Sequence, residues 1–197
     1  MEERLQWIMT RRSTRRFLER TVEEEKLDAV IEAGRAAPSG GNNQTTRFIV
    51  IRDREILDRL AREVSEAFRV MEITEGMYKS KVNSIRASKK GGYIFHYGAP
   101  VLITVANRRD YGNNMADCAC ALENMMIAAN MLDLGSCWIN QLHWLTEDPV
   151  IRKTMQDLGL EEDEVICGSL AVGYADTDDG LPNRKTLPRT GNPVHKW

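Results

Sequence analysis

The spacing of apolar residues along the chain predicts a series of helices. They are expected, in chain order, at about residues 5–9, 21–37, 54–71, 115–132 and 149–158. Thr21 and Glu24 have the spacing of a capping box at the start of the second helix, and Pro38 ends it. Residues 115–132 are apolar over most of the helix surface. This helix is therefore predicted to be buried at the centre of the fold, with Gly135 as its C-terminal stop.

Short apolar runs rich in β-branched residues predict three or four strands. These runs lie at about residues 48–51, 101–106, 137–139 and 165–172. Between residues 74 and 97 the helical periodicity fades, and two interpretations remain open: a mobile or variable excursion, or one more surface helix. The tail from about residue 176 is too polar to pack alone. No repeat or linker divides the chain, so residues 1–197 are predicted to form a single domain.

Composition is typical of an ordinary globular domain. Hydrophobic residues make up 42% of the chain and charged residues 28%, and the net charge is −2. This slight negative charge argues against a general attraction to nucleic acid or to an anionic membrane. No apolar run is long enough to cross a membrane, and the first residues lack the pattern of a signal peptide. A cytoplasmic protein is therefore expected.

The four cysteines have no spacing typical of disulfides or zinc sites. Cys118 and Cys120 lie two residues apart in a predicted helix, so they point to different sides and cannot readily share a metal ion. The three histidines are scattered along the sequence. We expect these two cysteines, and also Cys137 and Cys167, to be buried as small hydrophobic side chains.

An arginine cluster follows the first predicted helix. Residues 11–16 contain four arginines, a serine and a threonine. Guanidinium groups and hydroxyls together suit the bidentate binding of a phosphate. A solvated charged face is the simpler interpretation, and the overall acidity disfavours a nucleic-acid contact. A second polar cluster at residues 38–44, one helix downstream, strengthens the phosphate hypothesis.

The common motifs of dinucleotide binding and nucleophilic catalysis are missing from the sequence. No strand is followed by Gly-x-Gly-x-x-Gly, and neither Gly-x-x-x-x-Gly-Lys nor Gly-x-Ser-x-Gly occurs. A phosphate-binding cluster without a nucleophile or a metal pattern suggests that a bound cofactor supplies the chemistry.

Several short motifs occur in a characteristic order. They are Arg-Arg-Ser-Thr-Arg at 11–15, Ala-Pro-Ser-x-x-Asn-x-Gln at 37–44, Gly-Ala-Pro at 98–100, Glu-Asn-Met at 123–125, Leu-Gly-Ser-Cys-Trp-Ile at 134–139, Gly-Tyr at 173–174 and Arg-Lys at 184–185. Each motif alone is loose, but together, in this order, they cover nearly the whole chain. The sequence thereby resembles the nitroreductase family of FMN enzymes.

The resemblance implies a fold and an assembly. The expected fold is α+β, with a mixed, mostly antiparallel sheet packed between helices. The expected assembly is a homodimer with two FMN sites at its interface. Residues 176–197 would then extend over the partner subunit, and residues 74–97 would form a variable lid over the site.

The resemblance also implies which residues hold FMN. The resemblance places five residues at the FMN phosphate: Arg11, Arg12, Ser13, Arg184 and Lys185. From the other subunit it brings Pro38, Ser39, Gly40, Asn42 and Gln44. Near the flavin ring it places Trp138, Ile139, Asn140 and Gln141, with backbone near the last two meeting N5 and O4. Arg15 would lie toward the pyrimidine edge, where its charge stabilises a reduced flavin.

The implied activity is FMN-dependent oxidoreduction. Hydride from NAD(P)H would pass through flavin N5 to an electron-poor small molecule, a nitroaromatic or a quinone, in a ping-pong cycle. Apart from the charge of Arg15, this chemistry requires no catalytic side chain. Two alternatives remain open: a non-catalytic FMN-binding or sensing module, and a specialised flavin reaction such as reductive dehalogenation or flavin fragmentation.

Two features depart from the family pattern. The chain has Gln44-Thr45-Thr46 where the family often has Gln-Pro-Trp. The family's mid-chain Asn and Lys contacts to the flavin also have no clear counterpart in residues 74–97. Both departures bear on substrate shape and flavin electronics more than on FMN binding.

Overall fold

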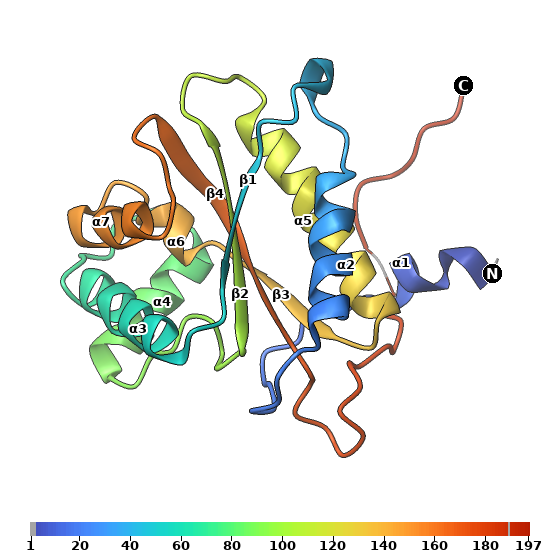
Figure 1. Cartoon of the computed structure of the whole chain (residues 1–197), viewed down its shortest axis with the longest axis horizontal. Helices are drawn as coiled ribbons and strands as arrows, with labels where there is room; N and C mark the ends of the chain where they lie inside the picture. The colour runs from blue at the N-terminus through green and yellow to red at the C-terminus, as the bar shows by residue number, and fades with distance from the viewer. Residues whose placement is uncertain (1–2, 189) are drawn as a thin grey trace.

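Four strands form one antiparallel sheet, and helices cover both of its faces (Figure 1). The computed structural model describes residues 3–188 and 190–197. In spatial order the strands are β1 (Arg47–Ile51), β2 (Val101–Arg108), β4 (Glu164–Gly173) and β3 (Gly135–Ile139). The pairings between these neighbours are all antiparallel. The predicted α+β class, with a mostly antiparallel sheet between helices, is therefore confirmed.

The central strands β2 and β4 are buried along nearly their whole length, because helices exclude water from both faces of the sheet. Alternate residues of β2 divide between two apolar cores, as the period of a strand requires. Val101, Ile103 and Val105 belong to one core, and Leu102 and Ala106 belong to the other. All the predicted strands are present, and their ends differ from prediction by one or two residues.

Two groups of helices cover the sheet. One face carries α2 (Glu24–Arg35) and α5 (Asn114–Met131), with the short α1 (Gln6–Thr10) beside α5 (Figure 1). The opposite face carries α3 (Arg54–Arg69), α4 (Lys79–Lys90), α6 (Gln141–Trp144) and α7 (Pro149–Asp157). Short 3-10 turns lie at Glu3–Leu5 and Gly40–Asn42. As predicted, α5 packs on the centre of the sheet, but only one side of it is buried, since Met115, Cys120 and Met131 are exposed.

Aspartate side chains start two of the helices. Asp53 accepts a hydrogen bond from the Ile56 amide (3.0 Å) at the start of α3. At the start of α7, Asp148 accepts from the amides of Val150 (3.0 Å) and Ile151 (3.1 Å).

The predicted capping box of α2 is wrong. The helix begins at Glu24, and the N-cap residue is Glu23, which makes no side-chain cap. The Glu23 carboxylate instead accepts a 2.6 Å hydrogen bond from the Tyr174 hydroxyl. The side chain at the start of this helix is therefore held by a residue far along the chain.

Gly135 was predicted to end α5, and this is wrong as well. The left-handed residue after the helix is Asp133 (φ 63°), and Gly135 is the first residue of β3. A Cβ atom at Gly135 would lie 2.7 Å from the Thr14 hydroxyl oxygen. The glycine therefore permits the close approach of the arginine segment to β3.

Of the two interpretations of residues 74–97, the structure shows the helix. It is α4, and it packs on α3. Its buried residues are Ser84, Ile85 and Ser88, and Phe95 is buried beyond its end. With one apolar residue among three buried positions, the helix has little apolar periodicity to detect. A role for this segment as a lid stays a prediction.

Three of the four cysteines are buried as predicted, but Cys120 is exposed. It lies on an exposed side of α5, away from the other described elements, so the prediction is wrong for this residue. Among the described residues, no group of three or more His, Cys, Asp or Glu side chains could hold a metal ion. No helix in the same part of the chain is long and apolar enough to cross a membrane.

The tail after β4 first follows the N-terminal segment. Phe17 and Ala175 form an isolated antiparallel bridge, and the Asp176 amide donates to the Arg16 carbonyl (3.0 Å). Residues 190–197 are exposed throughout, and residue 189 lies outside the described residues. The extension of this tail over a partner subunit stays a prediction.

Candidate functional site

The arginine segment lies along β3, at the edge of the sheet. Ser13 forms an isolated parallel bridge with Ser136, and the Thr14 amide donates to the Ser136 carbonyl (2.9 Å). Farther along, the Leu18 amide donates to the Tyr174 carbonyl (3.0 Å). The segment thus continues the sheet beyond its edge strand.

The two ends of the chain meet at this segment. A guanidinium nitrogen of Arg12 donates to the Lys185 carbonyl (2.8 Å). Arg184, one residue earlier, turns toward the end of α5. Its guanidinium bonds to the carbonyl and side-chain oxygens of Asn130 and lies 2.6 Å from Asp133 Oδ1. In this conformation Arg184 anchors the tail, and its role at a phosphate stays a prediction.

Two of the four arginines of the cluster lie next to carboxylates, and Arg15 does not. Arg16 pairs with Asp176 (2.7 Å), and Arg11 lies 3.6 Å from Glu123. Arg15 is exposed and makes no hydrogen bond or ion pair with any described residue. Burial raises the pKa of the Cys137 thiol, and the charge of Arg15 and a hydrogen bond with Ser13 partly offset this shift. The field of the cluster therefore reaches β3.

The loop at residues 38–44 is held by the first turns of α5. The Gly40 amide donates to the Asp117 carboxylate (3.1 Å), and the Tyr111 hydroxyl donates to the Gly40 carbonyl (3.1 Å) and to Asp117 (2.8 Å). Within the loop the Ser39 hydroxyl accepts from the Gln44 amide (3.0 Å). Asn42 and Gln44 both have positive φ, 56° and 53°.

Asp117 was not predicted as a site residue, although it is buried and fixes this loop. The available signal was a lone acidic residue in the first turn of a strongly apolar helix, where a carboxylate is favoured by the helix dipole.

A cavity of about 230 Å³ opens beside the loop. It is lined by Gly34, Arg35, Ala37, Pro38, Ser39, Gln44, Thr46, Phe48, Asp117 and Ala121. Three predicted site residues, Pro38, Ser39 and Gln44, are among them. The cavity is smaller than typical pockets for cofactors, which start near roughly 300 Å³.

Within one chain the loop and the junction of the two chain ends are well separated. The loop contacts α5 at Asp117, and the tail contacts it at Asn130. These two residues are about 20 Å apart along the helix axis at 1.5 Å per residue. The structure therefore brings together Arg11, Arg12, Ser13 and Lys185, but it does not bring residues 38–44 to them within one chain.

The last predicted group lies at the other end of β3. Trp138 Nε1 donates to Asn140 Oδ1 (2.7 Å), and Ile139 is buried. Gln141 is also buried, and its amide nitrogen donates to the Tyr93 hydroxyl (2.8 Å) and to Ser84 Oγ (3.3 Å).

Ser84 and Tyr93 were missed by the sequence analysis, because a serine and a tyrosine in a polar segment carry no distinctive pattern. Their hydroxyls lie 2.9 Å apart. Burial raises the pKa of Tyr93, so its hydroxyl stays protonated and can hydrogen bond at neutral pH. Together with Gln141 they connect α4 to the end of β3.

Residues 8–174 match the family model described as the nitroreductase family. The chain therefore belongs to the nitroreductase family, and the predicted resemblance is confirmed. The structure is similar to an FMN-bound nitroreductase of Bacteroides fragilis, with 31% identity, a TM-score of 0.83 and coverage of 100% of both chains.

Two further relatives support this family assignment. An FMN-bound nitroreductase of Desulfitobacterium hafniense has 26% identity and a TM-score of 0.81, with 99% of this chain and 100% of that chain covered. A protein of Archaeoglobus fulgidus, provisionally named an NADH dehydrogenase/NAD(P)H nitroreductase, is 30% identical over 178 residues. That alignment covers 88% of this chain and 86% of the relative.

Proposed function

We propose that this protein is an FMN-dependent NAD(P)H oxidoreductase that passes hydride to an electron-poor small molecule, such as a nitroaromatic or a quinone. Family membership and the FMN-bound relatives support the class of enzyme. The site proposal depends on one observation, the hydrogen bond from Arg12 to the Lys185 carbonyl. Through it, cationic residues from both ends of the chain gather beside β3.

The donor groups at this junction fit a phosphate. Arg11 and Arg12 offer guanidinium forks, and the exposed Ser13 offers a hydroxyl. Lys185 adds a further cation, whose backbone is fixed by Arg12. These four residues would hold the phosphate of FMN. The tail already lies beside the arginine segment, so it would not have to move.

β3 joins this phosphate site to the proposed ring site. Its first residues contact the arginine segment, and its last residue leads into Asn140 and Gln141. Five strand residues span about 13 Å at 3.3 Å per step. When bound, FMN supplies the redox chemistry by taking hydride from NAD(P)H and giving it to the acceptor. Arg15 places positive charge beside β3 to stabilise negative charge that develops there.

A homodimer would complete the site. The cavity beside the loop at residues 38–44 is too small for a whole cofactor, which supports a site shared with a second chain. Several apolar side chains near α1 and the end of α5 are between 46% and 53% exposed and suit a subunit interface: Leu5, Ile8, Met9 and Met131.

Absorption spectroscopy of the purified protein tests the proposal directly. We expect a flavin spectrum that bleaches during anaerobic titration with NADH or NADPH and recovers when a quinone or nitroaromatic is added. Parallel double-reciprocal plots would indicate the ping-pong cycle. A colourless protein that cannot be reconstituted with FMN would contradict the proposal. A bound flavin that neither nicotinamide reduces would instead favour the sensing module.

A further inference from the structure

A strongly basic helix lies on the face of the sheet opposite α5. The helix α4 and its flanks, residues 76–107, contain no Asp or Glu. The basic residues of α4 are Lys79, Lys81, Arg86, Lys89 and Lys90. None of them forms an ion pair with a described residue, whereas most exposed arginines of the neighbouring α3 do. In a chain of net charge −2, this is a concentrated and uncompensated positive surface.

Three of these five charges lie on one side of the helix. Lys79, Arg86 and Lys90 are spaced by seven and four residues, so they share a face, and all three are exposed. The opposite side of α4 faces inward and carries Ser84 and Ile85. A ligand can therefore reach these three cations from solvent.

A buried polar network fixes this basic helix next to the proposed ring site. Ser84 of α4 and Tyr93 just beyond it both accept hydrogen bonds from the Gln141 amide, at 3.3 Å and 2.8 Å. Gln141 directly follows Asn140 at the end of β3, where the flavin ring is expected. These two hydrogen bonds hold the inward side of α4 beside the place where hydride would be exchanged.

We propose that the basic face of α4 binds the phosphate groups of the nicotinamide donor, and that it therefore favours NADPH, with its additional phosphate, over NADH. This inference rests on the proposed oxidoreductase function. The chain has no glycine-rich dinucleotide motif to hold the donor's phosphates. Clustered lysine and arginine side chains attract such anions, raise their local concentration and increase the rate of encounter.

The triple variant Lys79→Gln, Arg86→Gln, Lys90→Gln tests the proposal in the FMN-loaded protein. At low salt we expect kcat/KM for NADPH to fall about tenfold, kcat/KM for NADH to fall less, and kcat to stay the same. Added salt should reduce the wild-type kcat/KM for NADPH and have little effect on that of the variant.

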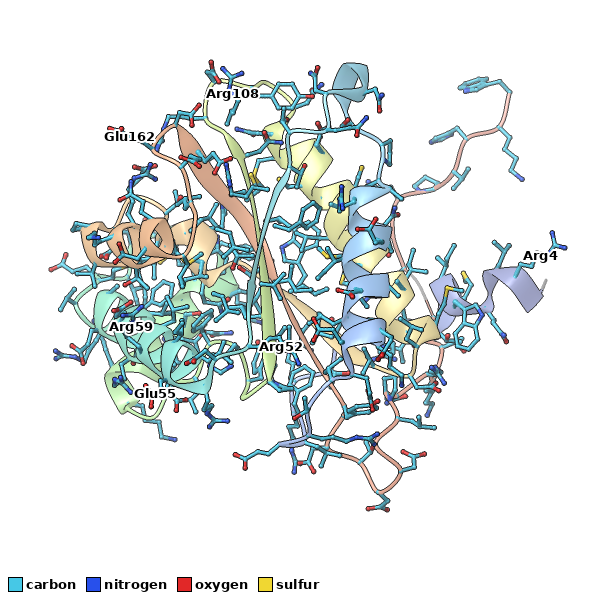
Figure 2. All side chains as sticks on the ribbon, viewed as in Figure 1. Arg4, Arg52, Glu55, Arg59, Arg108 and Glu162 are labelled. Atoms are coloured by element: carbon cyan, nitrogen blue, oxygen red, sulfur yellow. The ribbon has the colours of Figure 1, made fainter. Side chains whose placement is uncertain are left out.

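A matched variant controls for net charge. Arg4→Gln, Arg109→Gln, Lys153→Gln also removes three positive charges, from exposed positions on α1's flank, a loop and α7. Arg4 lies at the opposite end of the molecule from Arg59 of α3, the helix that packs on α4 (Figure 2). The control should keep the wild-type preference for NADPH and its salt dependence.

Equilibrium binding gives a readout that does not depend on turnover. Titration with NADP⁺ should show tighter binding than with NAD⁺, and the α4 variant should lose this difference. Inorganic phosphate should compete with NADP⁺ if α4 recognises phosphate groups. If the triple variant does not fold, the single substitutions Lys79→Gln and Lys90→Gln should each produce a smaller loss in the same direction.

Two results would overturn the inference. The first is a flavin that NADPH reduces normally, with identical salt dependence and NADP⁺ affinity in wild type, variant and control. That result would leave the proposed function intact. The second is salt-sensitive binding of RNA by α4 with no change in nicotinamide kinetics. Failure of both nicotinamides to reduce the flavin would instead contradict the proposed function itself, and NADP⁺ binding would still decide the role of α4.

Discussion

Two helices on opposite faces of the sheet, α5 and α4, are held by different forces. On one face α5 is held by apolar contact, because Leu122 and Met125 are fully buried against side chains of β2 and β4. On the other face α4 buries one apolar side chain, Ile85, and depends on hydrogen bonds among Ser84, Tyr93 and Gln141.

This difference divides the molecule into two parts: a framework, which is the α5 face, and a less firmly held part, which is α4. Apolar packing tolerates little change in shape, so the α5 face can fix the arginine segment, the loop and the tail. α4 contributes only Ile85 to the buried core of its face, so we expect it to open more readily than α5. Such low-stability elements are the usual source of lids and ligand-binding segments.

The largest expected effect comes from breaking the apolar face. Leu122→Ala would leave a cavity under α5, and we expect the free energy of unfolding to fall by about 2–5 kcal/mol. Denaturant unfolding at fixed protein concentration measures this loss. Cys120→Ala, at an exposed position of the same helix, should change it by less than about 0.5 kcal/mol. Equal losses in both variants would contradict the assignment of α5 as the framework.

The next effect concerns the segment that the α5 face holds. Arg12→Ala should weaken FMN binding by roughly 1.5–3 kcal/mol, as expected for a charge-assisted contact. Fluorescence titration of the apoprotein with FMN measures the change. Arg16→Ala is the matched control, because Arg16 is exposed and pairs with Asp176 at the surface. Unchanged affinity in Arg12→Ala would remove the proposed phosphate site.

A smaller effect should be confined to the α4 face. Tyr93→Phe removes a hydroxyl that joins Ser84 to Gln141, and we expect a loss of about 1–2 kcal/mol in local stability. Hydrogen exchange of the α4 amides should accelerate while that of α5 stays the same. Tyr97→Phe is the control, since its hydroxyl makes no hydrogen bond with any described residue. Faster exchange throughout the molecule would show that α4 belongs to the framework.

The smallest effect concerns the start of α2. The pKa of Glu23 is lowered from 4.5 to about 2, first by the hydrogen bond from the Tyr174 hydroxyl and then by its own backbone amide, Arg20 and Lys26. Because the folded pKa lies below the unfolded one, this contact stabilises the fold above about pH 4.5 and is lost as the pH falls toward 2. As the pH drops from about 4.5 toward 2, the melting temperature of Tyr174→Phe should therefore fall less than that of the wild type. Identical pH profiles for wild type and variant would contradict the assignment.

The same contrast explains what the sequence could and could not predict. The apolar stretch of α5 and the β-branched runs of the strands lead to burial directly, so their positions were predicted within one or two residues. In α4 two of the three buried residues are serines, so no apolar period marks the helix. Its packing is decided by Tyr93 and Gln141, which lie outside it.

Within the site, the arginine cluster was visible because its charge is concentrated in sequence. The contacts that orient the cluster were not visible in the sequence. Arg184 turns toward Asn130, a neutral residue 54 positions away, and Gly135 accommodates Thr14 rather than ending a helix. Long-range contacts of this kind leave no local pattern in the sequence. Residue type and order along the chain, in contrast, can be read from it directly.

Asn130 also constrains the order in which the molecule can be completed during synthesis. Its amide nitrogen donates to the Trp7 carbonyl, and its oxygens accept from Arg184. The N-terminal helix leaves the ribosome first, yet its partner on α5 is made more than a hundred residues later. On the proposed assignment, the phosphate donors are complete only after Lys185 has been translated. Flavin loading would then follow the release of a nearly finished chain.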